Sequence, residues 1–274
     1  MNGRIAKAPV VVIGAGVMGT GIVGLFAQSG FPTTLVDVDE KALAVALKKV
    51  IRRHGSADGV RISPDLASAV ADASFVVEAV PERMELKLSI FRQLMSAAPH
   101  NALLATNTST MSVTAIGHAS DPARVVGMHF FNPVHRMRLV EIVVGSGTSS
   151  ETRDRALELA RMLGKDPIVV RDSPGFATSR LGIALGNEAM RMVDEGVAST
   201  ADIDTGMRLG YGHPMGPLEL ADLVGLDARL NNTRSMFEQT GLDHFRPPGI
   251  LERLVAEGKL GKKSGHGFYD WSTP

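Results

Sequence analysis

Three glycines stand at a spacing that lets the backbone wrap around phosphate groups. Gly14, Gly16 and Gly19 directly follow the β-branched residues 10–13 and open an apolar stretch over residues 18–29. The first glycine permits a tight turn, the second lets the backbone approach a pyrophosphate, and the third lets a helix pack on a strand. The helix N-terminus adds unpaired N–H groups and a partial positive charge. The pattern therefore predicts a dinucleotide site on a strand–turn–helix unit.

An acidic residue follows at the distance that this site requires. Asp37 ends a second apolar stretch, T-T-L-V-D, 18 residues after Gly19. A carboxylate in this place accepts hydrogen bonds from the adenosine ribose hydroxyls and repels a 2′-phosphate, so NAD is favoured over NADP. The alternative is that the glycines serve tight packing and that Asp37 is a solvated strand end. The spacing as a whole favours the NAD site.

A histidine and a glutamate flank a predicted chain reversal. His129 lies in V-V-G-M-H-F-F, Asn132-Pro133 forces a turn, and R-L-V-E-I-V-V carries Glu141. If the reversal is centred near His135, both residues are six positions from it and face each other across neighbouring strands. The carboxylate would fix the imidazole tautomer, and the other ring nitrogen would take a proton from a substrate hydroxyl. The alternative is that both side chains are structural.

Two further groups follow predicted strands. Ser109 lies in T-N-T-S-T and could bind a substrate oxygen or the nicotinamide carboxamide, although a helix N-cap is the alternative role. Glu82 and Lys87 follow F-V-V-E-A-V, at the carboxyl edge of the expected sheet, where ligands of doubly wound folds bind. A solvated helix face is the alternative for this pair.

Composition excludes several function classes. The 274 residues include 29 Lys and Arg against 29 Asp and Glu, so the formal net charge is zero, and no cysteine is present. A binder of nucleic-acid phosphates needs a basic surface, and a chain without cysteine has no disulfide, Fe–S cluster or Cys-bound zinc. We predict no metal site. Residues 8–36 carry no charge, but six glycines interrupt them, so we expect no membrane segment and a cytoplasmic protein.

The order of the predicted elements indicates two domains. Strands and helices alternate over the first 170 residues, as in parallel βαβ units, with strands at 10–13, 33–38, 75–80, 103–106, 125–131 and 138–144. Ser173-Pro174-Gly175 then forms a link, and the rest is helical, with helices at 176–195, 200–209, 217–224 and 250–257. We predict a Rossmann-type, doubly wound α/β domain over residues 1–171, followed by an all-α domain over residues 172–274.

Eight segments in order resemble one known family. They are G-A-G-V-M-G-T-G-I, E-A-V-P-E-R-M-E-L-K, T-N-T-S, H-F-F-N-P-V, L-V-E-I-V, D-S-P-G-F, H-P-M-G-P-L-E-L-A-D-L-V-G-L-D and G-K-K-S-G-H-G-F-Y-D. Together they resemble the 3-hydroxyacyl-CoA dehydrogenases, including 3-hydroxybutyryl-CoA dehydrogenases, over nearly the whole chain.

The resemblance assigns roles to individual residues. It implies that His129 is the general base, that Glu141 is its partner and that Ser109 contacts the substrate oxygen and the cofactor. It also implies a helical domain that forms a homodimer, and a place in fatty acid metabolism. The NAD site would be lined by Gly14, Ala15, Gly16, Val17, Met18, Gly19, Asp37, Glu82, Lys87, Asn132 and Lys263.

Three departures from the family pattern concern the substrate. Ser179 stands where the family has an asparagine that helps to position substrate, and Asn187 on the same helix could compensate. The segment 41–61 is too short for the long helical arm that helps many members to hold CoA. Its basic residues could still contact CoA phosphates or could form a solvated face: they are Lys48, Lys49, Arg52 and Arg53. Arg136 adds a cation close to the expected substrate, where the family has an apolar residue.

The sequence therefore predicts an NAD-dependent oxidoreductase that interconverts a 3-hydroxyacyl-CoA and its 3-ketoacyl-CoA by hydride transfer, with a His–Glu dyad. One alternative is a related dehydrogenase acting on a free hydroxy acid, whose carboxylate would pair with Arg136 or Arg138. Another is an NAD-binding protein whose catalysis is impaired by Ser179. A dehydrogenase of the catalytic-lysine type is disfavoured, because a His–Glu pair stands where the chemistry is expected.

Overall fold

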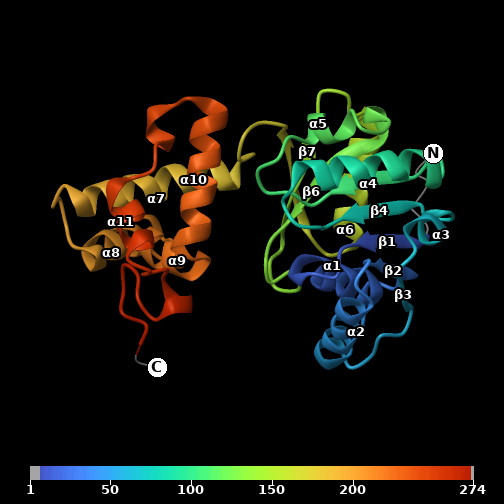
Figure 1. The fold of residues 1–274 in the computed structure, drawn as a ribbon, viewed down its shortest axis with the longest axis horizontal. Helices are drawn as coiled ribbons and strands as arrows, with labels where there is room; N and C mark the ends of the chain where they lie inside the picture. Colours follow the sequence, from blue (N-terminus) through green and yellow to red (C-terminus); the bar gives the residue numbers. More distant parts are fainter. Residues whose placement is uncertain (1–6, 273–274) are drawn as a thin grey trace. The chain divides into compact units, whose positions relative to one another are not determined.

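The computed structural model describes residues 7–272, and the chain divides into two compact units, residues 1–173 and 174–274 (Figure 1). Within the described part of the first unit, eight strands form one sheet in the order β3-β2-β1-β4-β5-β6-β7-β8. Neighbouring strands are parallel, except that β6 and β7 are antiparallel. The strands are β1 (Val10–Ile13), β2 (Thr33–Val36), β3 (Val60–Ser63), β4 (Phe75–Glu78), β5 (Leu103–Thr106), β6 (Val125–Phe130), β7 (Leu139–Val144) and β8 (Asp166–Arg171).

Helices cover both faces of this sheet. Side chains of α1, α2 and α6 share one hydrophobic core with the sheet, and α4 and α5 lie over the opposite face (Figure 1). The central strands β1, β4 and β5 are buried at every position, as strands covered on both faces must be. The helices of this unit are α1 (Val17–Gln28), α2 (Glu40–His54), α3 (Leu66–Val70), α4 (Met84–Ala97), α5 (Val113–Gly117), η1 (Pro122–Arg124) and α6 (Ser150–Met162).

The second unit is helical within its described residues. Its apolar core is built mainly by α7, α9, α10 and α11. The elements are α7 (Thr178–Asp194), α8 (Thr200–Tyr211), α9 (Pro217–Val224), α10 (Leu226–Thr240), η2 (Asp243–Phe245), α11 (Gly249–Ala256) and η3 (Lys262–Ser264). The predicted fold class, a doubly wound α/β domain followed by helices, is thus confirmed.

The differences from prediction lie in weakly patterned segments. The elements that were not predicted are the edge strands β3 and β8 and the helices α3, α5, α6 and α10. Both edge strands are largely exposed. An exposed strand does not need the continuous apolar run that marks a strand buried on both faces, so the sequence carried little signal for them. The strands predicted at 33–38 and 75–80 end two residues earlier, at Val36 and Glu78. Strand ends are set by pairing with neighbours, which a local pattern does not show.

One buried carboxylate holds the C-terminal segment against α9. Asp222 is fully buried and accepts hydrogen bonds from the amides of Phe268 and Tyr269 and from Nε1 of Trp271, each at 2.9 Å. We expect Asp222→Ala to destabilise this unit by about 3 kcal/mol, because three donors lose a charged acceptor. Trp271 is the single tryptophan, so its fluorescence during urea unfolding measures the change.

The matched control for this prediction is Asp270→Ala. Asp270 lies in the same segment, but its side chain is exposed; it accepts hydrogen bonds from Ser272 and lies 3.9 Å from Nδ1 of the exposed His266. An equal loss of stability in both variants would contradict the anchoring role of Asp222.

Candidate active site

A cavity of about 550 Å³ opens at the carboxyl edge of β1, β2 and β4. This is the edge at which doubly wound sheets bind ligands. Much of the predicted cofactor site lines it, and so do Asp39, Ala42 and Asn107, which were not predicted. The predicted residues that line it are Gly14, Ala15, Gly16, Val17, Met18, Asp37, Glu82 and Ser109.

The three glycines of the turn have different surroundings. Gly14 has φ +106°, and a Cβ there would lie 2.7 Å from the Ala79 carbonyl oxygen. A Cβ on Gly19 would lie 1.8 Å from the Gly14 carbonyl oxygen, so α1 can leave the turn only with a glycine there. A Cβ on Gly16 would meet nothing within 4 Å, so space at this backbone opens into the cavity. A pyrophosphate can approach the N-terminus of α1 through that space.

Asp37 connects the glycine turn to the end of β2. Its Oδ2 accepts the Ala15 amide at 2.7 Å, and its Oδ1 accepts the Asp39 amide at 3.0 Å. An ionised carboxylate has about four acceptor sites, so two remain for ribose hydroxyls. The cavity therefore has the parts that NAD requires: a turn open to phosphates and an acid for the ribose.

His129 and Glu141 lie directly opposite each other in the antiparallel pair of β6 and β7. His129 Nδ1 and Glu141 Oε2 are 2.7 Å apart. Glu141 is fully buried and His129 nearly so, at 6% exposure. A carboxylate at this distance holds the imidazole in one orientation, with the proton on Nδ1, and stabilises the charge that forms when Nε2 takes up a proton. The arrangement can carry out general acid–base chemistry.

A chain of charged and polar contacts holds the loop that carries Ser109. Glu82 accepts the Ser109 amide at 2.7 Å and the Thr108 hydroxyl at 2.9 Å. Lys87 is fully buried and does not line the cavity; its Nζ lies 2.8 Å from Glu78 and 3.5 Å from Glu82. Glu78 is also fully buried and was not among the predicted residues. The available signal was an acid at the end of the apolar run F-V-V-E.

Asn107 is a further residue that sequence reasoning missed. Its side chain lines the cavity, and its Oδ1 accepts the Phe130 amide at 3.0 Å. It thereby ties the Ser109 loop to β6 next to His129. The signal in the sequence was an amide side chain inside T-N-T-S, directly after a strand.

The remaining predicted residues lie elsewhere. Asn132 lines a separate cavity, and Arg136 is exposed on the loop between β6 and β7. Ser179 and Lys263 belong to the second unit, where Ser179 is half-buried on α7 and Lys263 pairs with Asp227.

The expectation that Asn187 compensates for Ser179 is wrong. Asn187 is fully buried, and its Nδ2 donates to the His244 carbonyl at 3.3 Å while Thr233 approaches its Oδ1 at 3.5 Å. These contacts make it part of the packing between α7, α10 and η2.

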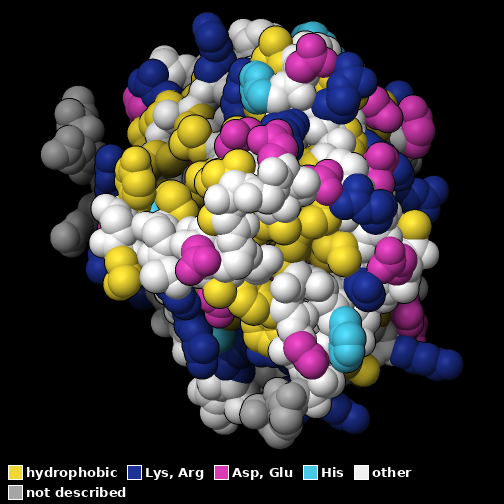
Figure 2. All heavy atoms as spheres, turned by 90° about the vertical axis from the view of Figure 1, so that its left-hand side faces the viewer, with side chains coloured by type: hydrophobic (Ala, Val, Ile, Leu, Met, Phe, Trp, Pro, Cys, Tyr) yellow, Lys and Arg dark blue, Asp and Glu magenta, His cyan; other side chains and the backbone are white. Residues whose placement is uncertain are grey.

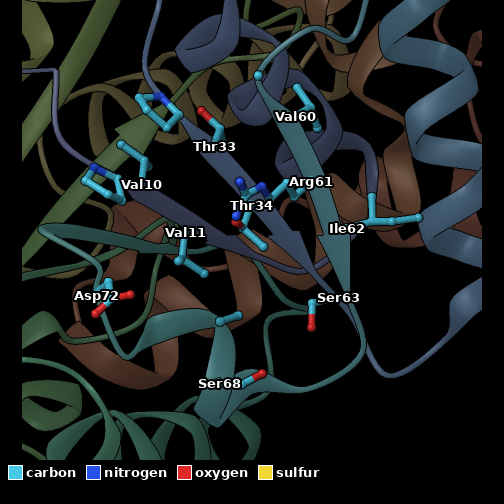
Figure 3. Close-up of a pocket in the computed structure, with 14 residues that line it drawn as sticks. Val10, Val11, Thr33, Thr34, Val60, Arg61, Ile62, Ser63, Ser68 and Asp72 are labelled. Atoms are coloured by element: carbon cyan, nitrogen blue, oxygen red, sulfur yellow. The ribbon is translucent and has the colours of Figure 1, made fainter.

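A larger cavity, of about 720 Å³, lies on the face of β1, β2 and β3 beside α3 (Figure 3). Figure 3 shows that β-branched, hydroxyl and charged side chains line it, including Val11, Thr34, Arg61 and Asp72. None of the predicted site residues lies there. The glycine turn, Asp37, Glu82 and Ser109 line the smaller cavity instead.

Comparison with known proteins agrees with this arrangement. Residues 9–173 match the NAD binding domain of 3-hydroxyacyl-CoA dehydrogenase, and residues 175–271 match its C-terminal domain. The chain belongs to the 3-hydroxyacyl-CoA dehydrogenase family. This confirms the resemblance found in the motifs, with NAD as cofactor and with the chain as an NAD-dependent oxidoreductase.

Relatives of this dehydrogenase cover nearly all of its length. A probable 3-hydroxybutyryl-CoA dehydrogenase of Bacillus subtilis is 39% identical over 96% of both chains. The mitochondrial hydroxyacyl-coenzyme A dehydrogenase of Sus scrofa is 38% identical over 98% of this chain and 92% of its own. The crystal structure of FadB2 from M. tuberculosis is 35% identical, with a TM-score of 0.89 over 95% of this chain and 98% of its own. Among the described residues, no helix is both long and apolar enough to cross a membrane.

Proposed function

We propose that this enzyme interconverts a 3-hydroxyacyl-CoA and the corresponding 3-ketoacyl-CoA, with His129 and Glu141 as its general acid–base dyad. The observation that carries the proposal is the 2.7 Å contact between His129 Nδ1 and Glu141 Oε2 on two paired strands. Family membership and the names of the relatives support the substrate class. A cytoplasmic location stays a prediction of the sequence.

In the oxidative direction, His129 Nε2 accepts the proton of the C3 hydroxyl while the hydride leaves C3, and a ketone forms. Glu141 stabilises the imidazolium, and Ser109 orients the reacting oxygen. NAD, when bound, supplies the hydride acceptor at its nicotinamide ring. In the reductive direction, His129 returns the proton to the oxygen as the ketone becomes an alcohol. Such acid–base assistance contributes about 10²–10⁴-fold in rate.

A basic cavity supports CoA as the carrier of the acyl group. Its volume is about 210 Å³, and it is lined by Lys49, Arg52 and Arg53 of α2 together with Asn132 and Val134. The pKa of His54, the residue after Arg53, is lowered first by burial and then by repulsion from Arg53. An anion with several charges, such as the phosphates of CoA, would relieve this repulsion.

The competing substrate, a free hydroxy acid, has less support. Arg138 already contacts Asp166 at 2.9 and 3.1 Å, so a substrate carboxylate would have to compete with Asp166 for it. The other candidate partner for a substrate carboxylate is Arg136, which is exposed on the loop between β6 and β7.

We also propose that the second unit forms a homodimer. Hydrophobic side chains come to its surface on the face seen in Figure 2. Large apolar side chains that are at least half exposed within this unit are Leu181, Val197, Leu209, Tyr211 and Val224. Where such side chains join into one apolar patch, the patch marks a protein interface.

The test compares acetoacetyl-CoA with free acetoacetate by the loss of NADH absorbance. We expect kcat/KM for the free acid to be about 100-fold lower, because the carrier's binding energy is lost. Arg53→Glu should raise KM for acetoacetyl-CoA about tenfold, on the order of 1.4 kcal/mol, and leave the Kd of NADH unchanged.

Arg92→Glu is the matched control for this test, because Arg92 is an exposed arginine on α4, the helix over the other sheet face. Equal turnover of both substrates would favour the free-acid enzyme. NADH binding with no turnover of any hydroxyacyl or ketoacyl substrate would favour the impaired protein with Ser179.

A further inference from the structure

We infer that Glu78 is a positioning residue for Ser109, and that it acts through Lys87 and Glu82 in one network. This inference rests on the proposed role of Ser109 at the substrate oxygen. The network begins at Glu78, which pairs with Lys87, and Lys87 in turn pairs with Glu82. Glu82 accepts the Ser109 amide and so joins the network to the Ser109 loop.

The inner end of the network joins β4 to β5. Glu78 Oε1 accepts the Val80 amide at 2.7 Å and Lys87 Nζ at 2.8 Å. Its Oε2 accepts the Thr106 hydroxyl at 2.7 Å. Thr106 is the last residue of β5, and the Asn107 amide donates to the Glu78 carbonyl at 2.7 Å. The side chain and the backbone of Glu78 thus hold both the start of the Ser109 loop and the strand before it.

The outer end of the network reaches the cavity. Lys87 Nζ lies between the two carboxylates, and the Glu82 side chain is 40% exposed beside the Ser109 loop. Glu82 then accepts the Ser109 amide and the Thr108 hydroxyl, while the Thr108 hydroxyl accepts the Met111 amide. The loop therefore takes its position from a carboxylate that is itself held by Lys87.

Burial makes each member depend on the others. Both Glu78 and Lys87 are fully buried, and a buried charge is tolerated only when it is paired and hydrogen-bonded. Burial raises the pKa of Glu78, and Lys87 opposes that rise. When Glu78 lacks its charge, Glu82 is the one carboxylate of the network that still pairs with Lys87. Lys87 then attracts the Glu82 side chain inward, away from the Ser109 amide. Displacement of a reacting group by about 1 Å costs on the order of 100-fold in rate, so this contact bears on turnover.

The experiment compares E78Q with the double variant E78Q/K87M. We expect E78Q to lower both Tm and kcat, the latter about tenfold, with KM changed less than kcat. The double variant removes the stranded ammonium, so Tm should recover. Its kcat should stay low, because nothing then holds Glu82 against the loop. Amide exchange in residues 107–111 should be faster in both variants, a measurement that needs no substrate.

R124M is the matched control. Arg124 is another buried cation of this unit, donates to the Pro99 carbonyl at 2.7 Å, and lies before β6, at the opposite edge of the sheet. The R124M variant should have a lower Tm, but its kcat and its amide exchange in residues 107–111 should match those of the wild type. Recovery of kcat together with Tm in E78Q/K87M, or a loss of kcat in R124M equal to that in E78Q, would overturn the inference. If the wild type turns over no ketoacyl-CoA, the proposed function fails, while the exchange result still decides the position of the loop.

Discussion

Replacement of His129 by alanine is expected to lower turnover of acetoacetyl-CoA by at least about 100-fold, within the range of general acid–base catalysis. The reason is that Glu141 then has no imidazole to orient, and no other group in the pair can exchange the proton of the hydroxyl. The Kd of NADH, followed by fluorescence, should stay near the wild-type value, because neither residue of the pair lines the cavity of the glycine turn. Steady-state kinetics and NADH titration together check the prediction.

His118→Ala is the control for this variant. His118 is an exposed histidine that follows α5 in the same unit, so its loss should change neither kcat nor NADH binding. Turnover of His129→Ala within threefold of the wild type would remove His129 from the mechanism. The turnover of Glu141→Gln should lie between that of the wild type and that of His129→Ala. Its amide can still contact Nδ1 but does not stabilise the imidazolium.

Replacement of Gly16 by valine should weaken NADH binding about 100-fold, on the order of 2.7 kcal/mol, without lowering Tm. Gly16 has φ −69°, a backbone conformation open to every residue, and a Cβ there meets no protein atom within 4 Å. The valine side chain would instead fill the space that a pyrophosphate needs. Fluorescence titration with NADH and thermal unfolding without ligand measure the two effects separately.

Gly19→Ala gives the contrasting result. Its Cβ would collide with the Gly14 carbonyl oxygen at 1.8 Å, so the turn itself must move and Tm should fall even without NADH. If Gly16→Val binds NADH like the wild type, then the cofactor does not approach the backbone at Gly16, and the site must be placed elsewhere.

Much of the fold could be predicted because its signals are local. The β-branched strands, the glycine turn after β1 and the acid at the end of T-T-L-V-D each act within a few residues, and their spacing is a property of the chain itself. The antiparallel approach of His129 and Glu141 also followed from a short reversal, since a turn near His135 leaves little freedom in the register.

The rest depended on contacts between segments far apart in sequence. The pattern of the chain did not show that Lys87 is buried against Glu78, since a lysine on an amphipathic helix usually reaches solvent. Nor did it show that Asn187 is enclosed between helices, or that Arg138 is taken up by Asp166, 28 residues later. The edge strands β3 and β8 became strands only by pairing with β2 and β7.

The sequence by itself determined the layered α/β architecture of the first unit, the helical second unit, the NAD fingerprint and the identity of the candidate base and its partner. The architecture and the fingerprint follow from periodicity, turn chemistry and residue type, whereas the roles of the candidate base and its partner rest also on the resemblance of the motifs to a known family. The tertiary structure decided which side chains share a carboxylate, which of them face the cavity and which are enclosed in the core. Strand order brings β4 beside β5, and that neighbourhood, which no local pattern encodes, places Glu78 and Lys87 beneath the loop of Ser109.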